Sequence, residues 1–112
     1  MLTMTMTANP PESSTRIAVV ADASRWELAV DGELDLHSGP ELVDVAMILA
    51  SYRVPVVELD LRGVGFVDIA GWRAVEESLD ILATAGTVAT VRRCSEPVQR
   101  FRALFAQAGS AA

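Results

Sequence analysis

The sequence contains no lysine, and it has one cysteine, one histidine and one tyrosine among its 112 residues. A single cysteine cannot form an internal disulfide, which is consistent with a reducing compartment. All 9 basic residues are arginines, and the 15 acids that outnumber them give a formal net charge of -6. This charge argues against non-specific nucleic-acid binding, because such binding requires a basic surface that displaces counterions.

Long hydrophobic runs are also missing. The longest are Ile17 to Ala21 and Val45 to Ala50, whereas a membrane-spanning helix needs roughly 18 apolar residues or more. The first residues show neither the basic region nor the apolar core of a signal peptide. We therefore predict a cytoplasmic protein without membrane insertion.

The residue types that carry catalysis do not occur in recognisable arrangements. His37 has no second histidine or cysteine at metal-ligand spacing, and Cys94 follows two arginines without a histidine or acid placed to activate it. We predict a loop position for His37 and a half-buried structural position for Cys94. The segment Gly63-Val64-Gly65 lacks the remainder of a phosphate-binding loop. These patterns predict a protein that is not an enzyme and has no metal or cofactor.

Charge is distributed unevenly along the chain. Residues 26–60 are rich in acids and contain Arg53 as their one base, whereas residues 92–105 contain four arginines and Glu96 as their one acid. Such an asymmetry can steer a protein partner. The simpler interpretation, which we favour, is two solvated faces of opposite charge.

The N-terminal half predicts a flexible tail at residues 1–14, followed by strands at 16–21 and 26–30. Asp31-Gly32 is expected to interrupt the second strand. Ser38, followed three residues later by Glu41, fits a capping box at the start of a helix. The helical spacing of four side chains gives its packing face: Leu42, Val45, Leu49 and Tyr52.

The C-terminal half predicts strands at 56–61 and 87–91 and two further helices. Apolar residues at successive positions of the strand at 56–61 indicate a central strand covered on both faces. A helix at 69–85 ends at Gly86, with an inward stripe of Trp72, Val75, Leu79 and Leu82. Trp72 as an exposed interface anchor is the alternative. A last helix begins at Ser95 and packs through Val98, Phe101, Leu104, Phe105 and Ala108.

The resulting order is β-β-α-β-α-β-α. After the initial hairpin, strands and helices alternate, which implies parallel pairing with right-handed crossovers. The pattern therefore predicts an α/β domain with a mixed four-stranded sheet and about three packed helices. We place this domain at residues 15–109 and expect residues 110–112 to be disordered.

Two motifs are particularly informative about function. Gly32 to Ser38, with the sequence Gly-Glu-Leu-Asp-Leu-His-Ser, precedes the first helix, and Leu59 to Gly71 contains a strand, a glycine-containing turn and a helix start after Asp68. In this order they resemble the STAS domain of sulphate transporters and anti-sigma factor antagonists. The resemblance covers roughly residues 15–109. In that family the helix start typically reads Asp-Ser-Ser/Thr-Gly, whereas here it reads Asp68-Ile69-Ala70-Gly71.

The resemblance implies a binding module that takes part in partner switching. Such a domain binds an anti-sigma factor of the histidine-kinase-like ATPase type, which then phosphorylates the second hydroxyl residue of the motif. The equivalent position here is Ala70, which has no hydroxyl. Asp68 matches the motif aspartate as a helix cap, a partner contact or both, and Gly71 matches the motif glycine. The implied partner-binding residues are Asp35, His37, Ser38, Phe66, Asp68, Ile69, Ala70, Gly71 and Arg73.

Two explanations of Ala70 remain open: unregulated binding, which we favour, and drift in a non-signalling domain. STAS domains also serve as non-enzymatic subunits of lipid-transport ATPase complexes and stress-sensing assemblies, where a missing phosphoacceptor would be unremarkable. A transporter or stress-complex subunit is therefore the alternative partner. A weak homodimer is compatible with either role.

Overall fold

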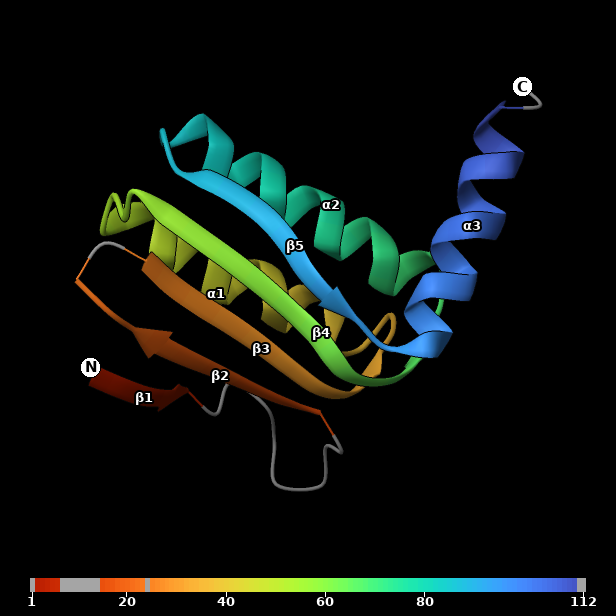
Figure 1. Cartoon of the computed structure of the whole chain (residues 1–112), viewed down its shortest axis with the longest axis horizontal. Coiled ribbons are helices and arrows are strands. Elements are labelled where there is room, and N and C mark those ends of the chain that lie inside the picture. The colour runs from red at the N-terminus through yellow and green to blue at the C-terminus, as the bar shows by residue number, and fades with distance from the viewer. Residues whose placement is uncertain (1, 7–14, 24, 111–112) are drawn as a thin grey trace.

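The computed structural model describes residues 2–6, 15–23 and 25–110, which form one sheet and three helices (Figure 1). The strands are β1 (Leu2–Met6), β2 (Arg16–Ala21), β3 (Arg25–Leu34), β4 (Val56–Val67) and β5 (Val88–Cys94). The helices are α1 (Gly39–Ser51), α2 (Ile69–Thr84) and α3 (Glu96–Ser110). Helices α1 and α2 lie side by side on one face of the sheet, and α3 extends from its end (Figure 1).

The sheet is mixed, with the strands in the order β1-β2-β3-β4-β5. The pairs β1–β2 and β2–β3 are antiparallel, whereas β3–β4 and β4–β5 are parallel. The chain crosses between the parallel strands through α1 and then α2, so these two helices run in the same direction. The α/β class and the predicted β-β-α-β-α-β-α order, which correspond to β2 through α3, are confirmed.

The N-terminal segment departs from the sequence prediction. Instead of belonging wholly to a tail, Leu2–Met6 forms β1, with Leu2 opposite Ala21. The sequence Leu-Thr-Met-Thr-Met alternates apolar and β-branched residues, which suits a strand. Pairing with β2 also satisfies backbone groups that an open sheet edge would leave unpaired. The rest of the predicted tail, residues 1 and 7–14, and the last two residues of the predicted disordered end, 111–112, lie outside the described residues.

Strand β3 is longer than predicted because Asp31-Gly32 distorts the strand without ending it. Its register with β4 shifts between Ala29 and Asp31 and again between Gly32 and Glu33. Gly32 has a φ of 107°, a conformation that glycine adopts without steric strain. The irregularity lets β3 continue as far as Leu34, next to the end of β4.

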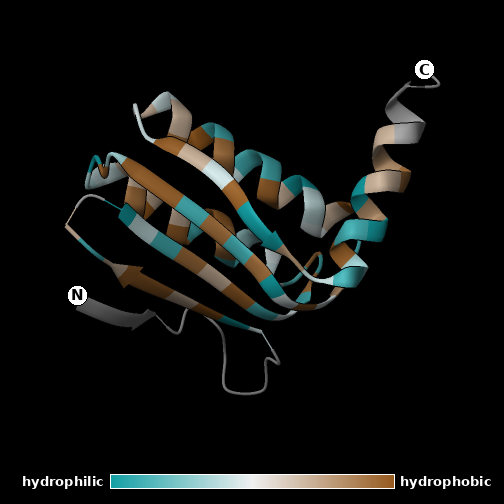
Figure 2. Cartoon of the chain, in the orientation of Figure 1, coloured by the Kyte–Doolittle hydropathy of each residue, from teal (hydrophilic) through white to brown (hydrophobic). Residues whose placement is uncertain are grey.

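The core lies between the sheet and the helices α1 and α2. Hydrophobic and hydrophilic residues alternate along β2, β3 and β4 (Figure 2), so that one side of each of these strands faces the helices. The predicted inward residues of α1 and α2 are buried at Leu42, Val45, Leu49, Val75 and Leu82, and Leu79 is partly buried against them. Trp72 is also buried, at 8% exposure, which confirms its inward position.

Two side chains assigned to packing faces lie elsewhere. Tyr52 is the C-cap of α1, and its exposed ring lies 5.8 Å from that of Trp26. Leu104 points away from the packing face of α3, while Phe101 packs against Trp72 at a ring separation of 6.3 Å. The last predicted packing residue, Ala108, belongs to α3, but its side chain lies outside the described set.

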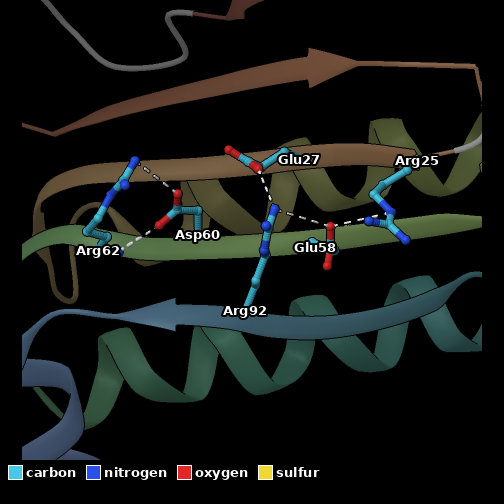
Figure 3. A network of polar contacts seen from close by, with 6 residues as sticks. All are labelled: Arg25, Glu27, Glu58, Asp60, Arg62 and Arg92. Carbon is cyan, nitrogen blue, oxygen red and sulfur yellow. Dashed lines mark hydrogen bonds and ion pairs between the residues drawn. The ribbon is translucent and has the colours of Figure 1, made fainter.

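The prediction that β4 is covered on both faces is wrong. In the described part of the chain, α1 and α2 lie on one face, and charged side chains extend across the other (Figure 3). Glu58 and Asp60 alternate with Leu59 along β4 and point to this open face. Asp60 is nevertheless buried, because neighbouring side chains lie over it.

Candidate functional site

The two sequence motifs meet at one end of the sheet. Strands β3 and β4 are parallel and end in register, with Leu34 beside Val67. The backbone N–H of Asp68 donates a hydrogen bond to the Leu34 carbonyl at 3.2 Å, which holds the start of α2 against the end of β3. The loop from Asp35 to Ser38 therefore lies beside the start of α2.

Asp35 and Ser38 are both used to fix the shape of this loop. The Asp35 carboxylate accepts hydrogen bonds from the backbone N–H groups of His37 at 2.9 Å and Ser38 at 3.0 Å. The Ser38 hydroxyl donates to the Glu33 carbonyl at 2.7 Å and accepts from the Asp35 N–H at 2.9 Å. The hydrogen bond from the Ser38 N–H is the main cause that lowers the pKa of Asp35 below its ordinary value.

The predicted capping box at the start of α1 is therefore wrong. Ser38 occupies the N-cap position, but its side chain makes no capping hydrogen bond. Its hydroxyl is instead directed back to Glu33 and Asp35, and the residue is 4% exposed. Ser38 thus fixes the loop beneath the candidate surface, and its hydroxyl is not available to a partner.

The start of α2 has the geometry that the motif predicts. Asp68 is the N-cap, and its carboxylate accepts a hydrogen bond from the Gly71 N–H at 2.8 Å. A Cβ atom on Gly71 would overlap the carbonyl of Leu34, so the glycine allows the helix to lie directly on the β3 backbone. Asp68 and Gly71 together fix where the first turn of α2 is presented.

The exposed residues around this helix start are mainly apolar. Leu36 is 67% exposed, Phe66 is 49% exposed and Ile69 is 57% exposed. His37 and Arg73 are exposed at the same end of the domain, and Ala70 is half-buried. Burying large apolar side chains that were exposed to water is favourable, so a partner that covers them gains free energy. We call Leu36, Phe66 and Ile69 the apolar patch.

Among the described residues, the hydroxyl groups closest to Ala70 along the chain and in the adjacent loop are both buried. The nearest one along the chain, Ser78, is fully buried, and its hydroxyl donates to the Ala74 carbonyl at 2.7 Å. Ser38, in the adjacent loop, is also buried and hydrogen-bonded. A protein kinase acting on the folded domain would find neither group accessible.

A groove for which the sequence gives no clear motif adjoins the apolar patch at Leu36. It has a volume of about 450 Å³ and is lined by Leu36, Gly39, Pro40, Val43, Asp44, Ala70, Arg73, Ala74 and Glu77. The small residues allow α1 and α2 to approach closely, since a Cβ on Gly39 would lie 3.0 Å from the Cβ of Ala74. The only sequence signal for this groove was the spacing of small residues at the starts of the two helices.

The opposite face of the sheet carries a network of charged side chains (Figure 3). Arg92 lies 3.4 Å from a carboxylate oxygen of Glu27 and 3.7 Å from one of Glu58, and Arg25 lies 3.5 Å from Glu58. Arg62 similarly lies 3.5 Å from Asp60. Each of these three carboxylates, on Glu27, Glu58 and Asp60, thus lies near a guanidinium group.

Neither a metal centre nor a membrane span is found in the described part of the chain. Among residues 15–23 and 25–106, no three histidine, cysteine, aspartate or glutamate side chains are grouped so that they could hold a metal ion. No described helix is long and apolar enough to cross a membrane. Cys94 is half-buried, as predicted, and its sulfur accepts a hydrogen bond from the Arg102 guanidinium at 3.3 Å.

Comparison with known proteins supplies a fold relationship. No family model matches the sequence, and no curated protein matches it significantly. Among solved structures, an anti-sigma factor antagonist from Mycobacterium paratuberculosis has a TM-score of 0.71 at 19% identity, over 90% of this chain and 85% of that one. The antagonist SpoIIAA in its unphosphorylated form has a TM-score of 0.61 at 14% identity, over 76% of this chain and 79% of that one.

The chain has a STAS-like fold. A longer protein, Mglu, contains a similar unit: it has a TM-score of 0.61 at 23% identity, and the match covers 66% of this chain but 18% of Mglu. SpoIIAA has also been solved in its phosphorylated form, again with a TM-score of 0.61, at 16% identity. At these identities the structural likeness establishes the shared architecture.

Proposed function

We propose that this protein is an anti-sigma factor antagonist that acts in the cytoplasm by binding an anti-sigma factor of the histidine-kinase-like ATPase type. The observation that carries the proposal is the apolar patch around the capped start of α2, at the end of the sheet where both motifs meet. The STAS-like fold shared with two solved antagonists supports it. Binding the ATPase would free a sigma factor, and no step requires this protein to catalyse a reaction.

The contact surface in this proposal consists of the loop and the first turn of α2. Its exposed members are Leu36, His37, Phe66, Ile69 and Arg73. The remaining expected residues shape it: Asp35 and Ser38 fix the loop, Asp68 caps the helix, and Gly71 allows its close approach to β3. Ala70 contributes a methyl group at the mouth of the groove.

Calorimetry with purified candidate ATPases, with and without nucleotide, tests the proposal. A single charge in the patch, Ile69→Asp, should weaken binding at least tenfold, because it places a carboxylate in a contact that excludes water. Val88→Asp is the matched control, since Val88 is 62% exposed and lies on β5, away from the patch. The proposal is wrong if no candidate ATPase binds, or if both substitutions weaken binding equally.

In this proposal, binding is not switched off by phosphorylation at the helix start. SpoIIAA is known in phosphorylated and unphosphorylated forms, whereas residue 70 here is alanine and Ser78 is buried. A phosphate adds nearly two negative charges, enough to disrupt a docked interface. Without an acceptor, the complex should persist in ATP, and the protein acts as a constitutive antagonist or as a competitor of regulated ones.

Mass spectrometry after incubation with the ATPase and ATP tests this part. The natural sequence should remain unmodified, Ala70→Ser should become phosphorylated, and Ala70→Asp should bind more weakly. Stoichiometric phosphate on the natural sequence would contradict the proposal. A helix start that presents serine correctly but is still not phosphorylated would show that the ATPase docks elsewhere.

A second candidate is a non-enzymatic subunit of a larger assembly. The alanine at position 70 is compatible with it, because such a subunit needs no phosphoacceptor. Purification of the protein from its native cells separates the two candidates. Co-elution with an ATPase in a small complex supports antagonism, whereas co-elution with a transporter permease or a large stress complex supports the subunit role.

A further inference from the structure

The outward surface of α1 and α2 is acidic. These two helices contain one base, Arg73, and five acids: Glu41, Asp44, Glu76, Glu77 and Asp80. Within the part of the chain that the structure describes, none of these six side chains takes part in an ion pair of 4.0 Å or less. The negative charge on this surface therefore has little compensation from within the domain.

Between the two helices, the groove combines an apolar lining with acidic walls. Asp44 lies on α1 and Glu77 on α2, so carboxylates line both sides. Leu36, Pro40, Val43 and the small residues at the helix starts contribute the apolar lining, and Arg73 of α2 adds one cation to the two carboxylates. Met47, one turn beyond Val43 on α1, is exposed and continues the row of apolar side chains along this helix.

Neighbouring charge is the second influence, after burial, on the pKa of Glu41 on α1. Burial is the main cause that raises the pKa of Glu41 above its ordinary value, and the neighbouring charges of Asp44 and Asp35 raise it further. Asp44 and Glu77 line the groove without an ion-pair partner among the described residues, so a basic group is the chemistry that this surface is best suited to receive.

The geometry of the groove favours a helical partner. Two helices packed side by side present a groove into which the side-chain ridge of a third helix fits. An extended peptide usually gains its affinity from the unpaired backbone of a sheet edge, and the backbone of a helix interior offers no such groups. Aliphatic side chains on one face of the incoming helix would cover the apolar lining while flanking cations approach the walls.

We propose that the groove between α1 and α2 receives an amphipathic helix of the anti-sigma factor, with aliphatic side chains on the groove floor and lysine or arginine beside Asp44 and Glu77. This inference rests on the proposed function for the identity of the partner. It adds a second contact, along the helices, to the contact at the apolar patch.

Charge reversal at two adjacent residues of α2 tests the contact with the ATPase. Glu77 lines the groove, whereas its neighbour Glu76 is exposed but does not. We expect Glu77→Lys to weaken binding at least tenfold and Glu76→Lys to change it less than threefold. Equal effects would mean that overall charge alone steers the partner, and this would overturn the groove contact while leaving the proposed function intact.

An independent probe tests the groove if no ATPase binds. The probe is an amidated helical peptide with leucine on one face and lysine beside it, compared with a peptide in which glutamate replaces lysine. In a nuclear magnetic resonance titration, the lysine peptide should shift the backbone amide signals of Val43, Ala74 and Glu77, and the glutamate peptide should not. Glu77→Lys should abolish the shifts.

The two tests fail in distinguishable ways. Amide shifts in the groove without ATPase binding would support the groove and contradict the proposed function. Shifts confined to the open face near Glu27 and Glu58 would overturn the groove, as would equal shifts with both peptides. A tenfold loss of ATPase binding in Ile69→Asp but not in Glu77→Lys would restrict the interface to the apolar patch.

Discussion

The acidic side chains on the two sides of this sheet differ in whether they form ion pairs within the domain. On the open face, Glu58 lies between Arg25 and Arg92, and Arg92 also reaches Glu27 (Figure 3). On the side covered by α1 and α2, the outward acids have no ion-pair partner within the described residues. Glu27, Glu58 and Asp60 on the first surface are thus paired within the domain, whereas the five acids of α1 and α2 are not paired within the described part of the chain.

This difference indicates where a partner gains most. A charged group that already has a partner must exchange one ion pair for another, so little free energy is gained on binding. The acidic surface of α1 and α2 offers new pairs to a basic partner, and the groove and apolar patch offer apolar area to bury. The open face is thus a solvated, charged surface, while the helical side carries the candidate interface.

The largest expected difference between the two faces is in the free energy of unfolding, and two successive residues of β4 that point to opposite faces test it. Leu59 is fully buried under the helices, and Leu59→Ala should lower the free energy of unfolding by about 3 kcal/mol, because it leaves a cavity. Glu58→Gln should lower it by less than about 1 kcal/mol, since both arginine partners are substantially exposed. Urea denaturation measures both. Similar losses would show that the open face stabilises the fold as strongly as the core does.

A smaller effect is expected at the start of α2, where the helix lies on the β3 backbone. Gly71→Ala should cost about 2 kcal/mol, because its Cβ would overlap the Leu34 carbonyl and move the helix. Gly65→Ala is the matched control: its Cβ would meet no atom within 4 Å, so the change should be within about 0.5 kcal/mol. Thermal unfolding of the two variants decides whether this contact is as tight as the geometry indicates.

The smallest effect concerns Asp35 and depends on pH. Because the folded-state pKa of Asp35 lies below its ordinary value of 3.8, the ionised form stabilises the fold above that pH. The stabilisation should be lost as the pH falls through the folded-state pKa. Asp35→Asn should therefore be less stable than the natural protein by about 0.5 kcal/mol at pH 7, and the difference should shrink as the pH falls below 3.8 and the carboxylate is protonated. A difference that does not shrink would point to packing instead of charge.

Much of the fold could be predicted from local patterns. The helical spacing of apolar residues located the buried stripe of α2, Asp68 marked its start and Gly86 its end, where φ is 90°. Strands β2, β4 and β5 lie within a few residues of their predicted bounds, apart from the longer C-terminal end of β4. These features depend on residues near one another in the chain, so the sequence carries their signals directly.

The errors arose where distant segments decide the outcome. Leu2–Met6 forms a strand because it can pair with the edge of β2. The Ser38 hydroxyl makes no capping hydrogen bond because it donates to the Glu33 carbonyl instead. Whether β4 is covered on one face or two depends on where both helices cross, and α1 and α2 cross on the same side. Local periodicity contains no information on the first two choices, whereas the alternation of Glu58 and Asp60 with Leu59 already indicated a strand covered on one face.

The candidate site divides in the same way. The sequence by itself determined that residues 68–71 begin a helix without a hydroxyl, that a Gly-Glu-Leu-Asp segment precedes the first helix, and that acids outnumber bases. Only the tertiary structure decided that these segments share one end of the sheet, that Leu36, Phe66 and Ile69 remain exposed there, and that an acid-walled groove adjoins them. The reason is physical: residue identity fixes the chemistry of a side chain, but exposure and proximity arise only when parallel strands bring separate loops together.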